Sequence, residues 1–324
     1  METCHLMDLS VLIPARNEQF LRKTVEDLLL NIRGETEIIV VLDGSWASPP
    51  LNQHKRVNII YCPVSIGQRA ACNQAAKLAR GKYVMKVDAH CAFDEGFDIK
   101  MLEAFKEVGD EVTMVPNMKN LHVFDYVCPD GHRRYQSGNG PCKDCGKPVS
   151  MEMIWKAKKS PNSTAFCFDS TPHFQYMGEY KEKQIGDLVE TMSLQGSCFM
   201  LTRKRYFDLD VCDESLGSWG SQGIEVACKS WLSGGRVLCN KRTWYAHCFR
   251  TQPGFRFPYH NPESQILGAK AKVRDLFFNN KWSKQVRPLS WLIEKFWPIP
   301  GWSEADLATL KEKDAMIGQW RQNS

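Results

Sequence analysis

The sequence of 324 residues lacks several features by which whole classes of protein are recognised. No stretch approaches the roughly 18 to 20 uninterrupted apolar residues that a membrane-spanning helix needs, so we expect no membrane partner. The N-terminal residues have neither the basic start nor the apolar core of a signal peptide. Internal repeats and low-complexity segments are absent as well. These absences predict a cytoplasmic protein.

Net charge and cysteine content exclude fewer classes of protein than these absences do. A net charge of +5 is small for this length, so it permits an anionic partner without indicating one. The 13 cysteines are an odd number in a long chain. Several of them lie inside apolar runs, namely Cys72, Cys198, Cys228 and Cys239. Buried free thiols and one metal cluster therefore explain the cysteines better than a disulfide framework does.

Short apolar runs alternate with helical patterns near the start of the chain. The runs predict strands at 9–13, 37–42, 57–61 and 83–87, and helical spacing predicts helices at 20–32 and 67–79. This alternation predicts an α/β fold with a mostly parallel sheet flanked by helices. Polar residues follow three strands, at 16–18, at Asp43 and at 88–90. Ligands bind at the carboxyl ends of strands in such sheets, so we expect these residues to converge.

The later chain is less regular. Residues 156–180 lack a clear pattern, and a helix is predicted near 224–233 and another from Ser303, a good N-cap. The C-terminal part also holds four tryptophans, Trp282, Trp291, Trp297 and Trp302. Tryptophans at such spacing pack against a protein core more often than they stack on nucleic-acid bases, so we interpret them as packing residues.

Asp88 and His90 directly follow a predicted strand. An aspartate and a histidine two positions apart on an extended segment can face one cation, and this mixed oxygen and nitrogen set suits Mn²⁺. Such an ion neutralises the diphosphate of a departing nucleotide. By itself the pair is more often a solvated loop aspartate beside a packed histidine.

The polar, glycine-containing segment at 128–148 holds four candidate zinc ligands, Cys128, His132, Cys142 and Cys145. Two close pairs separated by a short loop supply adjacent corners of a tetrahedral site. All four positions would be filled by protein, so we predict a structural Zn²⁺ in a knuckle. A redox-active or free thiol pair is the alternative, and His122 is a substitute ligand candidate.

Four short motifs occur in order at 88–91 (Asp-Ala-His-Cys), 219–225 (Trp-Gly-Ser-Gln-Gly-Ile-Glu), 231–235 (Trp-Leu-Ser-Gly-Gly) and 247–250 (His-Cys-Phe-Arg). They resemble the Asp-x-His, Trp-Gly-Gly-Glu-Asn-Leu-Glu, Trp-x-Cys-Gly-Gly and His-Val-Phe-Arg motifs of the polypeptide N-acetylgalactosaminyltransferases. The resemblance implies the nucleotide-diphospho-sugar transferase (GT-A) fold, a UDP-sugar donor and catalytic Mn²⁺. It covers roughly residues 9–258.

The resemblance also implies roles for individual residues. Asp88, His90 and His247 would ligate Mn²⁺. Arg250 would contact the diphosphate and compensate its charge as the bond breaks. The other implied site residues are Pro14, Arg16, Glu18, Asp43 and Arg69 on the uridine side, Gly196 and Trp219 beside the donor sugar, and Gln222 as a further catalytic candidate.

The sequence departs from the family in two ways. The Glu-Asn pair that reads the sugar is Gln222-Gly223 here, so we expect a donor other than UDP-N-acetylgalactosamine or several UDP-hexoses, with space at Gly223 for other substituents. Glu225 is kept, as a site residue or as a structural helix residue. The family's membrane anchor and lectin domain are not expected. We divide the chain into a catalytic domain (1–258, zinc-knuckle insertion 126–148) and a C-terminal helical extension (259–324).

The predicted reaction is metal-dependent transfer of a hexose or N-acetylhexosamine, with retention, to an acceptor hydroxyl. The zinc insert and basic segments such as 156–159 and 203–205 favour a hydroxymethylated DNA base, as virus-encoded transferases modify; the cytoplasm would then be that of the host. A protein Ser or Thr hydroxyl is one alternative. A nucleic-acid-binding protein on a degenerate transferase scaffold is another, and lysines on an ordinary solvated face are the simplest explanation of the basic segments.

Overall fold

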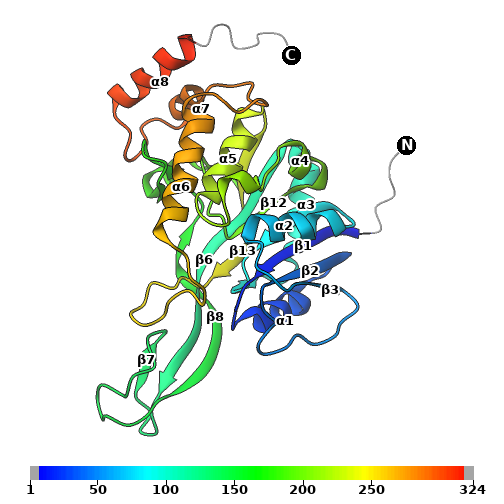
Figure 1. The fold of residues 1–324 in the computed structure, drawn as a ribbon, viewed down its shortest axis with the longest axis vertical. Coiled ribbons are helices and arrows are strands. Elements are labelled where there is room, and N and C mark those ends of the chain that lie inside the picture. The colour runs from blue at the N-terminus through cyan, green and yellow to red at the C-terminus, as the bar shows by residue number, and fades with distance from the viewer. Residues whose placement is uncertain (1–6, 317–324) are drawn as a thin grey trace.

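The N-terminal part of the central sheet is parallel. The structure is a computed structural model that describes residues 7–316 (Figure 1). The parallel strands lie in the order β3-β2-β1-β4, and their bounds are β1 (Met7–Ala15), β2 (Thr36–Asp43), β3 (Val57–Cys62) and β4 (Gly81–Val87). Helices α1 (Leu21–Asn31) and α2 (Gln68–Leu78) occupy the predicted connections. Every residue of β2 is buried, which explains the continuous apolar run at its centre, 38–42.

The rest of the sheet is mixed. Strand β12 (Cys198–Thr202) lies antiparallel to both of its neighbours, β4 and β6 (Val112–Val127). Beyond β6 come β13 (Arg236–His247), parallel to it, and β11 (Leu188–Glu190); the short β5 (Cys91–Phe93) pairs with β13. The predicted α/β fold with helices flanking the sheet is therefore confirmed, with parallel order limited to β1–β4 and to the β6–β13 pair.

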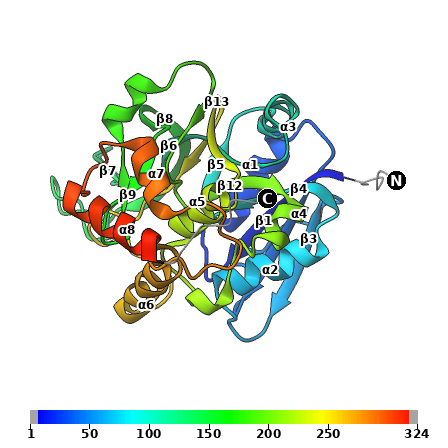
Figure 2. The same cartoon turned by 90° about the horizontal axis from the view of Figure 1, so that it is seen from above.

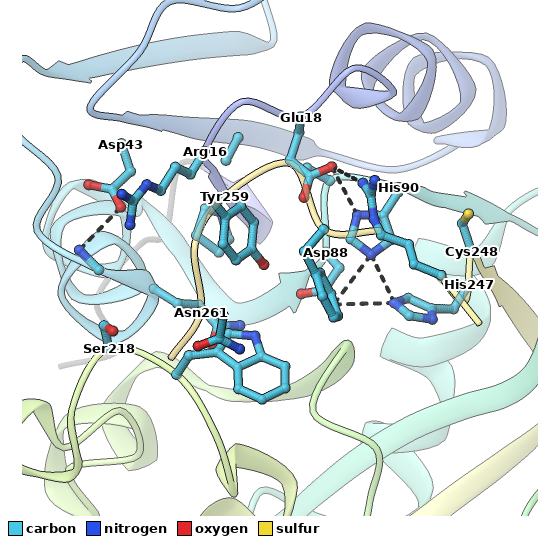
Figure 3. A pocket seen from close by; sticks show the side chains of 18 of the residues that line it. Arg16, Glu18, Asp43, Asp88, His90, Ser218, His247, Cys248, Tyr259 and Asn261 are labelled. Carbon is cyan, nitrogen blue, oxygen red and sulfur yellow. Dashed lines mark hydrogen bonds and ion pairs between the residues drawn. The ribbon is translucent and has the colours of Figure 1, made fainter. Parts of the chain in front are cut away.

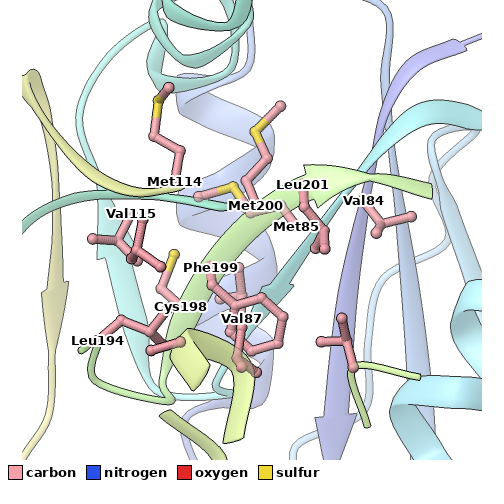
Figure 4. Packing of buried hydrophobic residues seen from close by; sticks show 14 of the residues in the cluster. Val84, Met85, Val87, Met114, Val115, Leu194, Cys198, Phe199, Met200 and Leu201 are labelled. Atoms are coloured by element: carbon pink, nitrogen blue, oxygen red, sulfur yellow. The ribbon is translucent and has the colours of Figure 1, made fainter. Parts of the chain in front are cut away.

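The centre of the sheet forms the main core. All five residues of β12 are buried. Figure 4 shows Met200 of β12 beside Met85 of β4 and Met114 of β6, its partners in the two neighbouring strands, all with no exposed surface. The surrounding helices are α3 (Phe97–Val108), α4 (Arg203–Asp208) and α5 (Gln222–Leu232), with short 3-10 turns at Gly178–Lys183 and Glu214–Leu216. This core fixes the strand ends that carry the polar residues.

A long hairpin of β6 and β8 (Ser150–Ser163) projects from the body (Figure 1). The strand β7 (Arg133–Tyr135) pairs with β6 near the hairpin's far end. The two-stranded sheet of β9 (Phe166–Phe168) and β10 (Phe174–Tyr176) follows it. The prediction of irregular structure from residue 156 onward is therefore wrong for β8. None of the residues of β8 is buried, so the strand has no apolar pattern in the sequence. Its extended conformation comes from pairing with β6.

The C-terminal helices pack into the same core as the sheet. They are α6 (Glu263–Val273), a π-helical turn (Arg274–Phe278), α7 (Leu289–Phe296) and α8 (Glu304–Met316). Seen from above, α7 and α8 lie on the side that holds β6 and β9, away from β3 (Figure 2). The ring of Trp231 lies 6.0 Å from that of Trp291, and Trp302 Nε1 donates to Phe168 O at 2.7 Å. These tryptophans are packing residues, as predicted.

Helix α8 begins as its sequence suggests, because Asp306 N donates to Ser303 Oγ at 3.1 Å. Between residues 7 and 316, none of the helices combines the length and the apolar character needed to cross a membrane.

Candidate metal centres and ligand cavity

Three predicted metal ligands converge where β4, β5 and β13 meet (Figure 3). Asp88 follows β4, His90 precedes β5, and His247 ends β13. The Nε2 atoms of His90 and His247 are 3.1 Å apart, and His247 Nε2 lies 3.3 Å from Asp88 Oδ2. One ligand atom of each residue lies within 4.8 Å of the other two. The fold thus joins residues up to 159 positions apart, and we call this cluster the trio.

Neighbouring charges hold the trio in its ligand form. Burial opposes ionisation of Asp88, but the ammonium of Lys86 and the two histidines outweigh it, so the pKa of Asp88 lies well below its usual range. Burial lowers the pKa of His247 to about 4, although Asp88 acts in the opposite direction. At neutral pH the trio therefore offers a carboxylate and a neutral imidazole, the protonation states that bind metal. This oxygen and nitrogen donor set fits Mn²⁺.

A cavity of about 330 Å³ opens beside the trio. A second chamber of about 200 Å³ shares four lining residues with it, namely Gln68, Asp88, Gln195 and Trp219. The larger chamber is lined by Pro14, Arg16, Glu18 and Asp43 from the first two strand ends, and the smaller one by Gly196 and Gln222. The two chambers meet at Asp88, so a ligand that spans both would pass the metal position.

Asp43 mainly orders the loop that enters α2. Its carboxylate accepts hydrogen bonds from Ser65 Oγ at 2.8 Å, from Ile66 N at 2.6 Å and from Gly67 N at 3.1 Å. A carboxylate offers about four lone-pair sites, so little accepting capacity is left for a nucleoside. Asp43 therefore shapes one wall of the cavity.

Arg69 does not line the cavity on the uridine side, contrary to expectation. Its side chain is 1% exposed, and its Nε donates to Glu225 Oε2 at 2.9 Å. The other nitrogens donate to Gly217 O and Gly220 O at 2.9 and 2.7 Å. Glu225 is buried as well and also binds Lys229 at 2.9 Å. The pair holds the segment that carries Trp219, and Glu225 is the structural helix residue of the two alternatives.

Arg250 lines the cavity, but its guanidinium is already engaged. It donates to Glu18 Oε2 at 2.5 Å and to Arg256 O at 3.3 Å, and it lies over the ring of Phe255 at 5.2 Å. Burial opposes ionisation of Glu18, yet His90 and Arg250 together lower the pKa of this carboxyl. Arg250 would bind a diphosphate with the donors that Glu18 and Arg256 leave unused, or by exchanging Glu18 for it.

The smaller chamber has a different shape from the one the sequence suggested. Gln222 Oε1 accepts from Gln68 Nε2 at 3.1 Å, and Gln222 Nε2 donates to Cys212 Sγ at 3.3 Å. A Cβ on Gly223 would lie 2.0 Å from Leu194 O. The prediction that Gly223 gives room to other sugar substituents is therefore wrong, because the backbone of residues 194–196 fills that space.

Sequence reasoning missed part of the cavity wall. Tyr259 and Asn261 come from the segment at 248–262, which connects β13 to α6, and Gln195 lies where the chambers join. Figure 3 shows Tyr259 between Arg16 and Asp88, and the Arg16 guanidinium lies 5.8 Å from its ring centre. The only signal for Tyr259 and Asn261 was their position soon after the motif that ends at Arg250.

The four cysteine and histidine ligands of the predicted knuckle also come together, at the tip of the hairpin. Cys128 Sγ lies 3.4 Å from His132 Nδ1, Cys142 Sγ lies 3.7 Å from the same atom, and Cys145 Sγ lies 3.7 Å from Cys128 Sγ. Tetrahedral zinc bonds of about 2.3 Å to sulfur and 2.0 Å to nitrogen imply ligand separations of about 3.5 to 3.8 Å. The set therefore fits zinc.

Two details refine this cluster. His122 is not part of it, because its Nε2 pairs with Asp125 Oδ1 at 2.7 Å. Backbone N–H groups of Asp144 and Cys145 lower the pKa of Cys142 to about 7. Thiolates are the form that binds zinc, so these N–H groups favour the metal-binding form of Cys142.

The sheet, the trio and the adjoining chambers define the fold class of the GT-A glycosyltransferases. Residues 10–136 match the model of glycosyl transferase family 2. Polypeptide N-acetylgalactosaminyltransferase 3 of Drosophila melanogaster is 24% identical over an alignment of 299 positions that covers 81% of this chain and 41% of that protein. The chain thus spans less than half the length of this relative.

Two solved structures share the fold. GalNAc-T7 with UDP, GalNAc and Mn²⁺ has a TM-score of 0.58 at 16% identity, over 96% of this chain and 55% of that one. Staphylococcus aureus TarS 1–349 with UDP-GlcNAc has a TM-score of 0.54 at 14% identity, over 90% and 71%. The predicted resemblance to UDP-sugar-dependent glycosyltransferases of the N-acetylgalactosaminyltransferase kind is confirmed.

Proposed function

We propose that the protein is a metal-dependent glycosyltransferase that moves a hexose or an N-acetylhexosamine from a UDP-sugar to an acceptor hydroxyl with retention. The observation that carries this proposal is the trio of Asp88, His90 and His247 at the junction of two chambers. The UDP and Mn²⁺ in the GalNAc-T7 structure and the UDP-GlcNAc in the TarS structure support the same ligand classes.

The chain's own residues divide the work along the cavity. The trio would hold Mn²⁺, which neutralises the diphosphate as it leaves. Lys86 contacts Asp88 and donates to Gly196 O at 2.7 Å. It therefore fixes both the ligand carboxylate and one wall of the smaller chamber, which would hold the sugar. Pro14, Arg16 and Tyr259 border the nucleoside side. Arg250 adds positive charge to the diphosphate once it leaves Glu18.

The lining of the smaller chamber supports the proposal of retention. Among the described residues that line it, Asp88 is the sole carboxylate, and its position in the trio commits it to the metal. Among these residues, no other carboxylate is left to act as the general base of an inverting reaction or as a nucleophile. The leaving diphosphate is then the group that accepts the proton of the incoming hydroxyl, on the same face of the sugar. The rate enhancement would then come from the positions of the reacting groups and from electrostatic stabilisation of the leaving diphosphate.

Calorimetric titration of UDP, with and without Mn²⁺, tests this proposal. We expect binding that requires Mn²⁺, is lost in His247→Ala and is kept in the matched variant His173→Ala, whose side chain is exposed and outside both chambers. UDP binding that is unchanged by EDTA would overturn the assignment of the trio. Mass spectrometry of the products of a UDP-sugar panel then identifies the donor.

For the acceptor we propose a hydroxymethylated DNA base. Its support is the lysine-rich surface of β8, where Lys156 and Lys159 are exposed and form no salt bridge within residues 7–316. Similarity to the polypeptide N-acetylgalactosaminyltransferases favours a Ser or Thr hydroxyl instead. A screen of hydroxymethylpyrimidine DNA against Ser/Thr peptides decides between them, and the cytoplasmic location stays a prediction.

We also propose that Cys128, His132, Cys142 and Cys145 hold one structural Zn²⁺. The support is the separation of their ligand atoms, together with the polarity of the surrounding loop. All four corners of the tetrahedron are protein side chains, so no position is left for a substrate.

A further inference from the structure

The loop between the two pairs of zinc ligands touches the segment that borders the ligand cavity. Gly138 N donates to Pro253 O at 2.8 Å. Gly138 and Gly254 also meet backbone to backbone, since a Cβ on Gly254 would lie 2.7 Å from Gly138 Cα. Pro253 and Gly254 belong to the segment 248–262, which brings Arg250 and Tyr259 to the cavity.

The position of Gly138 depends on what closes its loop. The loop runs from His132 to Cys142, and both of these residues are ligands of the zinc cluster. Inside it, Arg134 donates to Gly138 O, to Gly140 O at 2.8 Å and to Pro141 O at 3.3 Å. A metal that ties both ends removes most of the freedom of so short a loop. Without the metal, a polar, glycine-containing loop has little apolar burial to keep Gly138 in place.

The same hairpin holds the segment 248–262 at a second point. Phe255 is buried, and its ring lies 5.2 Å from Phe124 of β6 and 6.2 Å from Phe20. Phe255 in turn lies under the guanidinium of Arg250. The aromatic contact therefore fixes one part of the segment, and the Gly138 contact fixes the turn that precedes Phe255.

We propose that the zinc knuckle positions the segment 248–262, so that donor affinity depends on the knuckle although no zinc ligand touches the cavity. Gly138 is the positioning residue: it acts through Pro253 and Gly254 on Arg250 and the cavity wall. Loss of this contact raises the KM for the donor more than it changes kcat, because the segment binds the nucleotide and the trio performs the chemistry. The nucleotide readout rests on the proposed function.

Two glycines of the loop offer a matched pair of variants. A Cβ at Gly138 would lie 3.2 Å from Gly254 Cα, whereas a Cβ at Gly140 would meet nothing within 4 Å, and neither residue has a positive φ. We expect Gly138→Val to keep one zinc per chain and to speed amide exchange within residues 249–257 about tenfold. It should also weaken UDP binding in Mn²⁺ about five- to tenfold. Gly140→Val should change neither quantity.

Arg134→Met provides a second route to the same displacement, since it removes the donors that hold Gly138 O and Gly140 O. Zinc retention with wild-type exchange in residues 249–257 for both Gly138→Val and Arg134→Met would overturn the proposal. Amide exchange is measured without nucleotide, so it tests the role of Gly138 independently of the proposed function. Wild-type protein that binds no UDP in Mn²⁺ would refute the proposed function, while the exchange result would still decide the role of Gly138.

Discussion

The two metal clusters are held in place by different means. The ligands of the trio come from three strand ends of a buried sheet, and His90 and His247 are themselves buried. The four ligands of the knuckle lie within 18 residues at the end of a projecting hairpin, where most neighbouring side chains are exposed. The sheet builds the trio whether or not an ion is bound. We expect the knuckle to need the proposed Zn²⁺ to keep a defined shape.

The two metal clusters also differ in whether their surroundings leave the cation open to a ligand. The trio borders two chambers, so one side of its ion stays open to a ligand. In the knuckle four side chains would complete a tetrahedron around the proposed Zn²⁺. A preformed, open cluster suits a cation that is exchanged and takes part in a reaction, and a closed one suits a cation that stays. The comparison predicts that the two ions respond in opposite ways to the same treatment.

Chelation should give the largest difference. Brief EDTA treatment should abolish glycosyl transfer, because the open ion is removed, and Mn²⁺ alone should restore it. Metal analysis should find one zinc per chain throughout. Recovery that needs added zinc, or loss of zinc at the same rate as loss of activity, would remove the distinction between the clusters.

Removing one ligand from each cluster is the next test, and the trio should give the greater effect on turnover. His247→Ala should lower turnover at least about 100-fold, a loss of about 2.7 kcal/mol, since the remaining two ligands hold the ion weakly. The melting temperature should change little, because the sheet does not depend on the ion. Full activity of His247→Ala at low Mn²⁺ would exclude this histidine as a ligand.

Cys142→Ser should have the opposite profile. We expect loss of zinc, lower solubility and loss of amide-exchange protection within residues 128–149, because this loop has little apolar surface to fold on. The effect on UDP binding should stay within about tenfold. Cys62→Ser is the matched control, since Cys62 is a free thiol outside both clusters. Absence of zinc from wild-type protein, with Cys142→Ser unaffected, would remove the knuckle from the account.

Burial decided which elements could be predicted from the sequence. Strand β2 was expected at 37–42 and spans Thr36–Asp43, because both of its faces are covered and every position is apolar or paired. Strand β8 was missed, because most of its residues are exposed and its partner strand alone keeps it extended. The alternation of apolar and polar residues in a sequence reflects burial. Strand β8 has no buried residue, so its sequence carries no such alternation.

Residues of the site were predictable where a short motif carried them and not where packing did. The trio and the knuckle followed from local spacing and from motif order. Tyr259 was missed because its path back to the cavity depends on Phe255 packing against Phe20 and Phe124. Arg69 and Gly223 were misjudged because their partners, Glu225 and Leu194 O, are set by the tertiary fold.

The smallest predicted effect concerns Gln195, at the open side of the trio. Its Oε1 accepts from Ser197 N at 2.6 Å, and its Nε2 has no hydrogen-bond partner within residues 7–316 although the side chain borders both chambers. The amide of Gln222, in contrast, is engaged at both ends by Gln68 and Cys212. Of these two amides, that of Gln195 therefore remains free to donate to a sugar hydroxyl or to a diphosphate oxygen.

Gln195→Ala should raise the KM for the preferred UDP-sugar about two- to tenfold, the value of one hydrogen bond of about 0.5 to 1.5 kcal/mol. Discrimination between two UDP-hexoses should fall by a similar factor. Gln222→Ala should instead lower the melting temperature, because it leaves Gln68 without its partner, and should change donor discrimination less. A donor panel with both variants measures this. If Gln222→Ala changes sugar preference and Gln195→Ala does not, the sugar is read from α5, and the free amide beside the trio is not the one that selects the donor.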